Sequence, residues 1–403
     1  METRCVICKG RGLCGRPFCP ILAKFCAIKR ASIGDSIFGA SPPSVFVGRV
    51  GYPDVRLGPL VPPEIAAKDA RIYDDPAQWL GKGIEDVIGL RSNLVRSNTR
   101  LNVRSPRVLS DRLLIKTQML AMASAPVDTE VKFLKPPKME LRFDGILSPM
   151  GPSGTLKDMS ITENPSVPRK VDYLVSDKDV LAANATTELY ESDISVYHIN
   201  RLLSVGLLGR KKDRRLVPTR WAITATDDIV GKELIARVKD HSVLDEIRLF
   251  STQRFGNRFE ILLLPRPFSF ELIEIWMPRS VWVGEGTWVG ADREGYGGKR
   301  TYSLLAGGYY AARLGVVEYL ENIKRQASIF IVREILPDYW APLGVWVIRE
   351  AVRDAMRQEP KRFETADAAL NDVATRIRTP LRRWKKEAKL IHDFKFQKTL
   401  ASF

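Results

Sequence analysis

Cysteine occurs only at the amino-terminal end of this 403-residue chain, and this distribution constrains the fold more than any other feature. The stretch METRCVICKGRGLCGRPFCPIL holds four of the five cysteines, and none follows Cys26. Thiols scattered through a hydrophobic core would not be distributed in this way, so the cluster needs an explanation of its own. We therefore treat residues 1–30 as a separate module.

The spacing of the first four cysteines predicts a metal site. Cys5 and Cys8 form a Cys-x2-Cys pair, and Cys14 and Cys19 follow at short intervals. Zn²⁺ takes four ligands at tetrahedral corners, and the intervening glycines let so short a chain reverse its direction. A stretch of this length cannot bury a core, so metal binding has to supply its folding energy. We expect one structural zinc on these four thiolates.

Two alternatives to this assignment stay open. Cys26 is the expected spare, but it can replace Cys19 as a ligand. An iron–sulfur cluster also takes four cysteines. Disulfides are disfavoured in a reducing cytosol, and four cysteine ligands leave no open position for a catalytic water.

The charge of the chain points to polyanionic partners. It has 63 Lys and Arg residues against 47 Asp and Glu residues, a formal net charge of +16. Such an excess favours nucleic acid first and an anionic membrane surface second. The sequence has no apolar run long enough to span a bilayer and no apolar core of a signal peptide. We therefore expect a cytoplasmic, nucleoid-associated protein that has DNA, and no membrane, as its partner.

The order of the expected elements predicts an α+β fold. Strand patterns dominate the middle of the chain, around residues 246–277, and helical patterns follow from residue 301. We expect three parts, namely a zinc-finger-like module (1–30), a mixed α/β body with a helical carboxyl-terminal part (31–375), and a basic helix with a flexible tail (376–403). The alternative is two globular domains that divide near a Pro/Gly/Ser-rich loop at 148–170.

Particular stretches give sharper predictions. Two short strands are expected on either side of the Gly-Tyr-Pro-Asp turn at 51–54. The stretch VDYLVSD (171–177) is expected to be a strand, and ASIFIVREIL (327–336) a helix. The stretch TPLRRWKKEAKLIHDF (379–394) is expected to be one helix that buries an apolar face and exposes a basic one.

Several charged residues interrupt apolar runs, where burial of an unpaired charge costs several kcal/mol. The candidates for a catalytic site are Glu271, Glu274, Arg313, Glu318, Arg333 and Glu334. One interpretation is a pocket in which carboxylates bind a metal and arginines hold phosphate. The other is that each Arg pairs with a Glu inside a helical bundle. A weaker nuclease-like outline is Glu130-x-Lys132 after Asp111.

Two basic stretches are candidates for DNA binding. The first set of residues is Arg210, Lys211, Lys212, Arg214, Arg215, Arg220 and the adjacent Trp221. A basic loop beside an aromatic ring suits a phosphate backbone and a stacking platform, while the alternative is a solvated loop with a core Trp. The second set is Arg382, Arg383, Lys385 and Lys386.

The order of the motifs along the whole chain resembles the archaeal Nre family (NreA type). The stretches that carry the resemblance are RCVICKGRGLCGRPFCPI, RLVPTRWAIT, AGGYYAARLGVVEYL, LGVWVIREAVRDAM and QKTLASF. The resemblance implies a DNA repair protein that binds the sliding clamp, PCNA, through its carboxyl-terminal tail. It implies no catalytic residues.

The last seven residues fit this expectation. Gln397, Leu400 and Phe403 form Gln-x-x-Leu-x-x-Phe, without the second aromatic residue of the full clamp-binding box. In one turn of 3₁₀ helix, residues three apart point the same way, so Leu400 and Phe403 form a two-pronged apolar anchor. The function alternatives are a metal-dependent DNA-processing enzyme, nuclease-like or glycosylase-like, and an adaptor that brings the clamp to other repair proteins.

Overall fold

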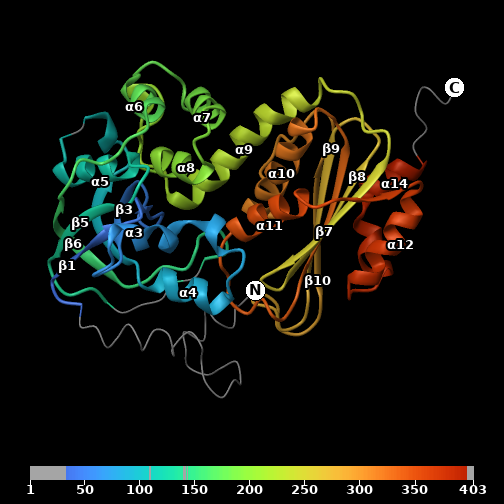
Figure 1. The fold of residues 1–403 in the computed structure, drawn as a ribbon, viewed down its shortest axis with the longest axis horizontal. Coiled ribbons are helices and arrows are strands. Elements are labelled where there is room, and N and C mark those ends of the chain that lie inside the picture. Colours follow the sequence, from blue (N-terminus) through green and yellow to red (C-terminus); the bar gives the residue numbers. More distant parts are fainter. Residues whose placement is uncertain (1–32, 109, 139–141, 143, 397–403) are drawn as a thin grey trace. The chain divides into compact units, whose positions relative to one another are not determined.

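The computed structural model describes residues 33–108, 110–138, 142 and 144–396, which fall into two compact units. We call residues 33–230 the first unit and residues 231–396 the second unit. Each is built on a six-stranded mixed sheet with helices packed on it, which confirms the α+β prediction (Figure 1). The boundary lies within helix α9 (Thr219–Val238). The body expected over residues 31–375 therefore contains two sheets with a core on each.

The sheet of the first unit has the strand order β1-β5-β6-β4-β3-β2. Neighbouring strands are antiparallel except β4 and β6, which are parallel. The strands are β1 (Ser36–Ser41), β2 (Val45–Val47), β3 (Asp54–Val61), β4 (Val95–Asn102), β5 (Val127–Phe133) and β6 (Ser153–Ile161). The expected pair of strands around the turn at 51–54 is present as β2 and β3.

Helices pack over this sheet and enclose an apolar core. The helices before α9 are α3 (Ala67–Ala70), α4 (Ile84–Ser92), α5 (Arg112–Met122), α6 (Arg169–Ser176), α7 (Ala182–Glu191) and α8 (Val196–Ser204). Asp111 caps α5 by accepting the Leu114 N–H, and Ser195 caps α8 in the same way. Helix α5 packs against α8, β3 and β6, which places the centre of the core between them.

Two predictions for the first unit are wrong. The stretch 171–177 lies largely in helix α6, where Val171 and Leu174, three residues apart, are the buried side chains. The expected loop at 148–170 contains strand β6, which is hydrogen-bonded on both sides. Its glycine is a packing requirement, because a Cβ on Gly154 would lie 2.6 Å from the Phe133 ring. A strand that needs small residues resembles a loop in composition.

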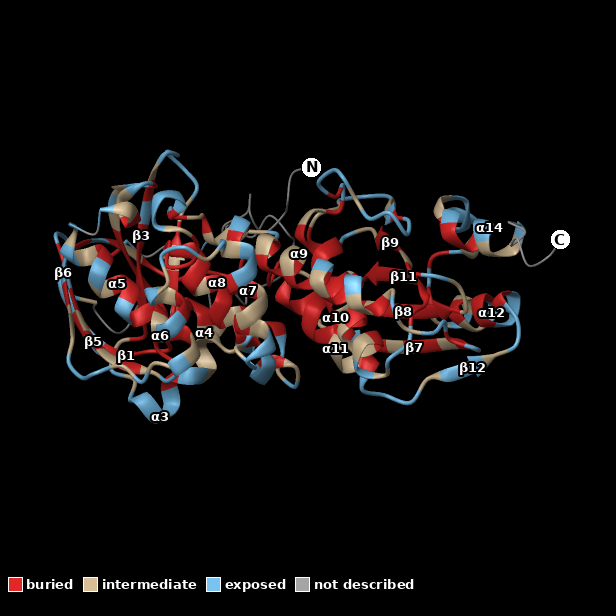
Figure 2. Ribbon diagram, turned by 90° about the horizontal axis from the view of Figure 1, so that it is seen from above, coloured by how far each residue is buried: buried red, intermediate tan, exposed pale blue. Residues whose placement is uncertain are grey.

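The sheet of the second unit has the order β10-β9-β11-β8-β7-β12, and β9 and β11 are the one parallel pair among the described strands of this sheet. The strands are β7 (Ile247–Arg254), β8 (Asn257–Leu264), β9 (Ser269–Trp276), β10 (Trp288–Glu294), β11 (Ser328–Ile335) and β12 (Lys361–Phe363). Figure 2 shows that β8 and β11, at the middle of this sheet, are buried.

Helices cover both faces of this second sheet (Figure 1). One face carries α10 (Ala306–Asn322) and α11 (Trp346–Met356). The other face carries α12 (Ala366–Arg376), α13 (Leu381–Trp384) and α14 (Lys389–Phe396). No helix within the described ranges is long and apolar enough to cross a membrane.

Residues 327–336 do not form the expected helix, because residues 328–335 are the central strand β11. All eight residues of β11 are buried, and a strand buried on both faces gives the same continuous apolar run as a buried helix. The single helix expected over 379–394 is also wrong, because Ala388 leaves helical geometry between α13 and α14. Trp384, Ala388 and Ile391 are nevertheless buried in the core, as their spacing predicts.

Candidate nucleic-acid interface

The six candidate catalytic residues all lie in the second unit, but they do not form one pocket. Adjacent residues of a strand point to opposite faces of a sheet. Glu271 and Glu334 therefore face α12–α14, while Glu274 and Arg333 face α10 and α11. The remaining two candidates, Arg313 and Glu318, come from α10.

Two of these glutamates hold the backbone of the carboxyl-terminal segment. The Glu334 carboxylate accepts the N–H groups of residues 378 and 379, at 3.0 and 2.7 Å. The Glu271 carboxylate accepts those of residues 389 and 390, at 3.1 and 2.8 Å. The second pair of N–H groups opens helix α14, where the helix dipole also favours a negative charge. Both carboxylates are thus helix-end and turn acceptors.

A third glutamate on the same face, Glu260, holds the segment by a side chain. Both of its oxygens accept from the Arg376 guanidinium, at 2.8 and 2.7 Å, and this pairing raises the pKa of Arg376. We call Glu260, Glu271 and Glu334 the glutamate clamp. Burial raises the pKa of Glu271 to about 7, although its two backbone hydrogen bonds act in the opposite direction.

On the face of the sheet toward α10 and α11, the two candidates Glu274 and Arg333 form an ion pair with each other. Arg333 donates to Glu274 at 2.6 Å and to the amide oxygen of Asn257 at 2.6 and 3.0 Å. The Trp276 indole donates to the second oxygen of Glu274, at 3.1 Å. A Cβ on Gly308 of α10 would lie 3.2 Å from Glu274 Oε1, so the helix passes directly over this pair.

The remaining two candidates are also paired. Arg313 donates to Glu294 at 2.8 Å, with both side chains buried, and Arg353 donates to Glu318 at 2.6 Å. The structure therefore favours ion pairing over a catalytic pocket, with partners that come from strands as well as helices. No group of three or more His, Cys, Asp or Glu residues in the described ranges is suited to hold a metal.

The nuclease-like outline finds no support in the first unit. Glu130 and Lys132, two residues apart on one face of β5, form an ion pair at 3.4 Å, and Asp111 accepts the Leu114 N–H as the cap of α5. The three residues thus have structural partners of their own.

The basic loop at 210–220 divides into anchored and free side chains. Arg214 is buried and donates to the carbonyl oxygens of Gly209, Val175 and Asp177, and burial lowers its pKa. Its assignment to DNA binding is therefore corrected, because it is an internal anchor of the loop. Arg210 pairs with Asp213 at 2.7 Å.

The outer side of this loop is exposed. Lys211 and Lys212 are exposed and form no ion pair with other described residues, and Arg215 contacts only a carbonyl oxygen at 3.4 Å. Arg220 lies 3.6 Å from Asp144. Trp221 is half-exposed rather than a core residue, which agrees with the stacking interpretation and not with its alternative.

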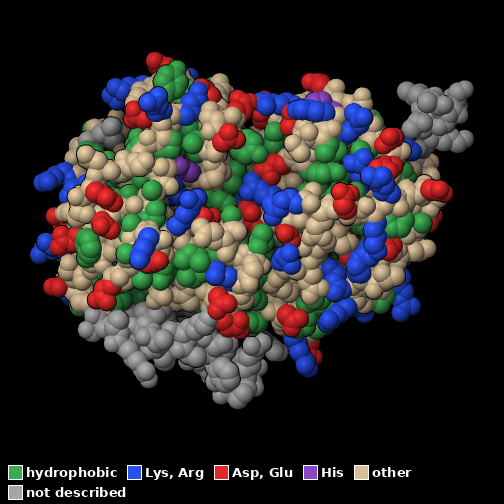
Figure 3. All heavy atoms as spheres, viewed as in Figure 1, with side chains coloured by type: hydrophobic (Ala, Val, Ile, Leu, Met, Phe, Trp, Pro, Cys, Tyr) green, Lys and Arg blue, Asp and Glu red, His purple; other side chains and the backbone are tan. Residues whose placement is uncertain are grey.

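The second basic set lies around α13. Arg382, Arg383, Lys385 and Lys386 are all exposed, and none forms an ion pair with another described residue. Trp384 between them is buried, which fixes the segment while the charges point outward. Figure 3 shows Lys and Arg side chains recurring over the region of α12 and α14.

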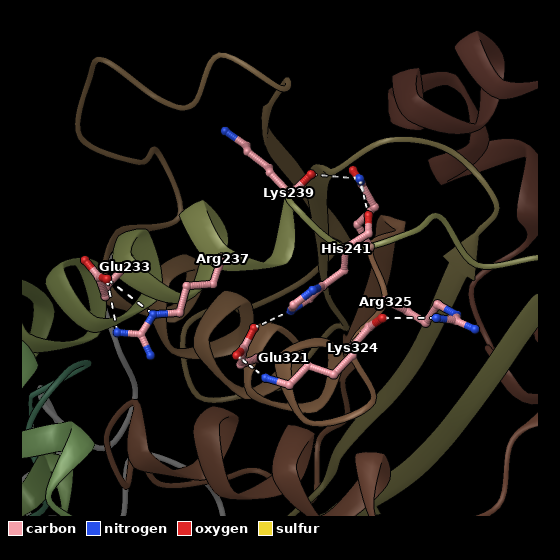
Figure 4. A network of polar contacts seen from close by, with 8 residues as sticks. Glu233, Arg237, Lys239, His241, Glu321, Lys324 and Arg325 are labelled. Carbon is pink, nitrogen blue, oxygen red and sulfur yellow. Dashed lines mark hydrogen bonds and ion pairs between the residues drawn. The ribbon is translucent and has the colours of Figure 1, made fainter.

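A polar network follows the end of α9 in the second unit (Figure 4). The Gln326 amide donates to the carbonyl oxygens of Lys239 and His241, at 3.0 and 2.6 Å. The His241 ring contacts Glu321 at 2.8 Å, and Glu321 also pairs with Lys324. The network joins the end of α9 to the turn between α10 and β11, which is a structural role.

Two predicted sites lie outside the described residues. They are the cysteine site, Cys5, Cys8, Cys14 and Cys19 with the spare Cys26, and the clamp-binding motif, Gln397, Leu400 and Phe403. Both stay predictions from the sequence.

Comparison with known proteins identifies the family. The model of the archaeal Nre amino-terminal domain matches residues 13–283, and that of the archaeal Nre carboxyl-terminal domain matches residues 294–403. The chain belongs to the archaeal Nre family. Among its relatives, DNA repair protein NreA of Archaeoglobus fulgidus is 42% identical over 94% of each chain, and DNA repair protein NreB of the same organism is 38% identical over 99% of each.

A third Nre relative is DNA repair protein NreA of Haloferax volcanii, which is 39% identical over 84% of this chain and 83% of its own length. No solved structure matches the chain. The resemblance to the Nre family that the motifs indicate is thereby confirmed.

Proposed function

We propose that this Nre protein is a DNA repair factor that binds DNA through its exposed basic side chains and the PCNA clamp through its carboxyl-terminal motif. It acts in the cytoplasm, at the nucleoid. The observation that carries the proposal is the set of exposed Lys and Arg side chains at 211–215 and 382–386 that form no ion pair with another described residue. Its curated relatives are DNA repair proteins, and the net charge of +16 suits a phosphate backbone.

DNA affinity measured against salt concentration tests the first half. Binding dominated by phosphate contacts weakens linearly in log–log form, with a slope of about −0.9 per phosphate on duplex DNA. The double variants Lys211→Ala/Lys212→Ala and Arg382→Ala/Arg383→Ala are each expected to reduce this slope by one to two units. Lys361→Ala is the matched control, because Lys361 already pairs with Asp372 at 3.0 Å. Slopes that are unchanged in both double variants would contradict the assignment.

The proposed interaction with PCNA is supported by the way in which the preceding segment positions the carboxyl-terminal motif. The glutamate clamp holds residues 376–390 on the sheet, and Lys395 of α14 pairs with Asp367. The motif starts at Gln397, one residue after α14 ends at Phe396. A short motif without the second aromatic residue of the full box is expected to bind with micromolar affinity.

The test is a titration of PCNA into the full chain and into a chain that ends at Phe396. The full chain is expected to bind, and the shortened chain is not. Leu400→Ala and Phe403→Ala are expected to lose binding with unchanged DNA affinity, while Ser402→Ala, at a variable position of the motif, keeps it. Equal affinity of the full and shortened chains would refute the motif.

The amino-terminal module is proposed to hold one structural zinc ion, because four thiolates at this spacing are a chemically complete donor set for that ion. Elemental analysis of purified protein is expected to give about one zinc per chain. Cys8→Ser is expected to abolish this and Cys26→Ser to leave it unchanged. Iron in place of zinc would favour the cluster alternative, and a metal-free protein of unchanged stability would rule out both.

The enzyme alternative receives no support from the geometry. All four candidate carboxylates are engaged by backbone N–H groups or by arginines, on different faces of the sheet. Incubation of the protein with a panel of damaged and branched DNA and a divalent metal distinguishes an enzyme from an adaptor. Binding without product is expected, and this favours the adaptor function. Turnover of any of these DNA substrates would instead support the enzyme alternative.

A further inference from the structure

Two aromatic rings of the first unit pack against each other at the surface. Tyr52 and Trp221 are 48% and 47% exposed, and their ring centroids lie 5.5 Å apart with the planes tilted by 53°. Neither ring belongs to a hydrophobic core cluster of the unit. The two rings come from residues far apart in the sequence, so the fold has to bring them together.

Hydrogen bonds fix the two segments that carry these rings. Tyr52 lies in the turn between β2 and β3, and Trp221 lies in the first turn of α9. The Val47 N–H of β2 donates to Thr219 Oγ1 at the start of α9, at 2.9 Å. The carbonyl oxygen of Pro53 accepts the Val103 N–H, also at 2.9 Å. The aromatic pair is therefore held in place by the backbone on both sides.

Three exposed arginines lie on the turn that carries Tyr52 and on the strands β3 and β4 next to it. Arg56 of β3 and Arg100 of β4 are directly opposite each other in the antiparallel ladder, and both are exposed. The Arg100 guanidinium reaches the turn, because its Nη2 lies 3.8 Å from where a Cβ on Gly51 would be. Arg49 is exposed in the same turn, where its carbonyl oxygen accepts the Tyr52 N–H at 3.4 Å. The hairpin that carries Tyr52 thus holds Arg49 and Arg56, and the neighbouring strand β4 holds Arg100.

These three arginines have no ion pair with any described residue. Asp54 accepts the Asn102 side-chain amide at 3.0 Å, and Asp144 is 3.6 Å from Arg220. Like charges placed directly opposite in a sheet are destabilising. A bound anion such as phosphate removes this repulsion, which makes the cross-strand pair a suitable phosphate site.

We propose that Tyr52 and Trp221, with Arg49, Arg56 and Arg100, form a binding site for unpaired nucleotides. A base stacks on the aromatic pair and the guanidinium groups hold the adjacent phosphates. The inference rests on the proposed DNA binding and specifies which form of DNA is bound. Of this site, only Trp221 was predicted from the sequence. The exposed tyrosine and the three arginines were missed because they lie about 120–170 residues before Trp221 in the chain.

The aromatic pair is what distinguishes this site from a general phosphate surface. In a duplex the faces of the bases are covered by their stacked neighbours, so an exposed ring finds no base face to contact. In a single strand, a gap or a frayed end, every base offers such a face. The site therefore selects unpaired DNA, and it does so with little dependence on sequence.

Fluorescence anisotropy with three labelled ligands of equal length tests the site in the full chain. The ligands are an oligothymidylate, a strand of abasic residues with the same phosphates, and a blunt duplex. Tyr52→Ala and Trp221→Ala are each expected to weaken oligothymidylate binding about tenfold, which corresponds to about 1.4 kcal/mol per stacked base. Binding of the abasic strand and of the duplex is expected to be unchanged.

Further variants separate stacking from charge and from misfolding. Trp221→Phe is expected to keep most of the affinity for oligothymidylate, because it keeps a ring. Arg100→Ala is expected to weaken both single strands and to reduce their salt slope by about 0.7. Tyr173→Ala is the matched control, because Tyr173 is an exposed tyrosine beside Lys170, on α6. A thermal melt of each variant is expected to match that of the unsubstituted chain.

Three results would overturn the inference. Trp221→Ala without effect on oligothymidylate contradicts the stacking, and an equal loss on the abasic strand assigns the effect to phosphate contacts alone. An effect of Tyr173→Ala as large as that of Tyr52→Ala removes the specificity of the site. If the full chain binds none of the three ligands, the DNA-binding part of the proposed function fails as well, which distinguishes the two failures.

Discussion

Glu271 is a buried carboxylate that accepts the backbone N–H groups of residues 389 and 390. Those partners, at the start of α14, favour its charged form, but burial outweighs them and raises its pKa to about 7. Arg293 and Asp393 act on it in opposite directions, the first lowering and the second raising the pKa. A group of this kind links the attachment of α14 to pH.

The pH dependence of stability is the first prediction. The folded-state pKa of Glu271 is about 7 and the ordinary value is 4.5, so the folded chain binds more protons than the unfolded chain between these values. The contribution is therefore fully present below about pH 4.5 and is lost as pH rises through 7. Its size is about 3 kcal/mol over the window. Urea unfolding of the full chain at pH 5, 6, 7 and 8 measures it.

The matching variants are Glu271→Gln and, as control, Glu364→Gln, which changes an exposed carboxyl of the same unit. Glu271→Gln is expected to flatten the dependence of the unfolding free energy on pH between 5 and 7, and Glu364→Gln to keep it. Identical slopes in the two variants would show that Glu271 does not titrate in this range.

At the scale of elements, α10 depends on glycines that bring it close to the sheet and to α11. A Cβ on Gly308 would lie 2.9 Å from Ile348 Cδ1 and 3.2 Å from Glu274 Oε1. A Cβ on Gly315 would lie 2.8 Å from Val352. Glycine lowers intrinsic helix stability by about 1 kcal/mol relative to alanine, and at these positions the close packing leaves no room for a larger residue.

Gly308→Ala is therefore expected to destabilise the chain by about 1–3 kcal/mol, despite the better helix propensity of alanine. Gly297→Ala is the control, since nothing lies within 4 Å of a Cβ there. It is expected to be within about 0.5 kcal/mol of the unsubstituted chain. Chemical denaturation of both variants measures the difference, and a stabilised Gly308→Ala chain would contradict the close packing.

Some helices and strands of the second unit could be predicted from the sequence, and others could not. Helices α11 and α12 lie in the stretch after residue 301 where helical patterns were expected, because their periodicity is visible. The strand β11 was not predicted, because burial on both faces removes periodicity, and its Arg333 and Glu334 are satisfied by residues that only the fold brings near. The break between α13 and α14 is likewise decided by Glu271, about 118 residues earlier.

The candidate sites follow the same rule. The basic residues at 211, 212 and 382–386 are exposed, as a DNA-binding surface requires, and this could be expected because their surroundings are local and polar. The buried role of Arg214 was missed, since it depends on carbonyl groups of residues 175 and 177. Tyr52 was missed for the corresponding reason, because its partner Trp221 lies on another element.

At the scale of the whole molecule, the described chain has two sheets, each with a core of its own, and the segment 148–170 belongs inside the first. Trypsin is expected to spare Lys157, although it is exposed, because β6 is hydrogen-bonded on both sides. The expected early cuts are at Arg279 and Arg300, which are exposed and lie outside strands and helices. Limited digestion followed by mass spectrometry locates them, and a first cut at Lys157 would favour a domain division near residue 155.

The glutamate clamp also determines how a mechanical load on the carboxyl end is carried. Glu271, Glu334 and Glu260 stand on β9, β11 and β8, three adjacent strands in the middle of the second sheet. A force applied to the chain beyond Phe396 loads the three glutamate contacts one after another. The contact of Glu271 with 389–390 comes first, that of Glu334 with 378–379 second, and that of Glu260 with Arg376 last. The segment 376–390 is therefore expected to detach from the sheet in three steps, one for each glutamate.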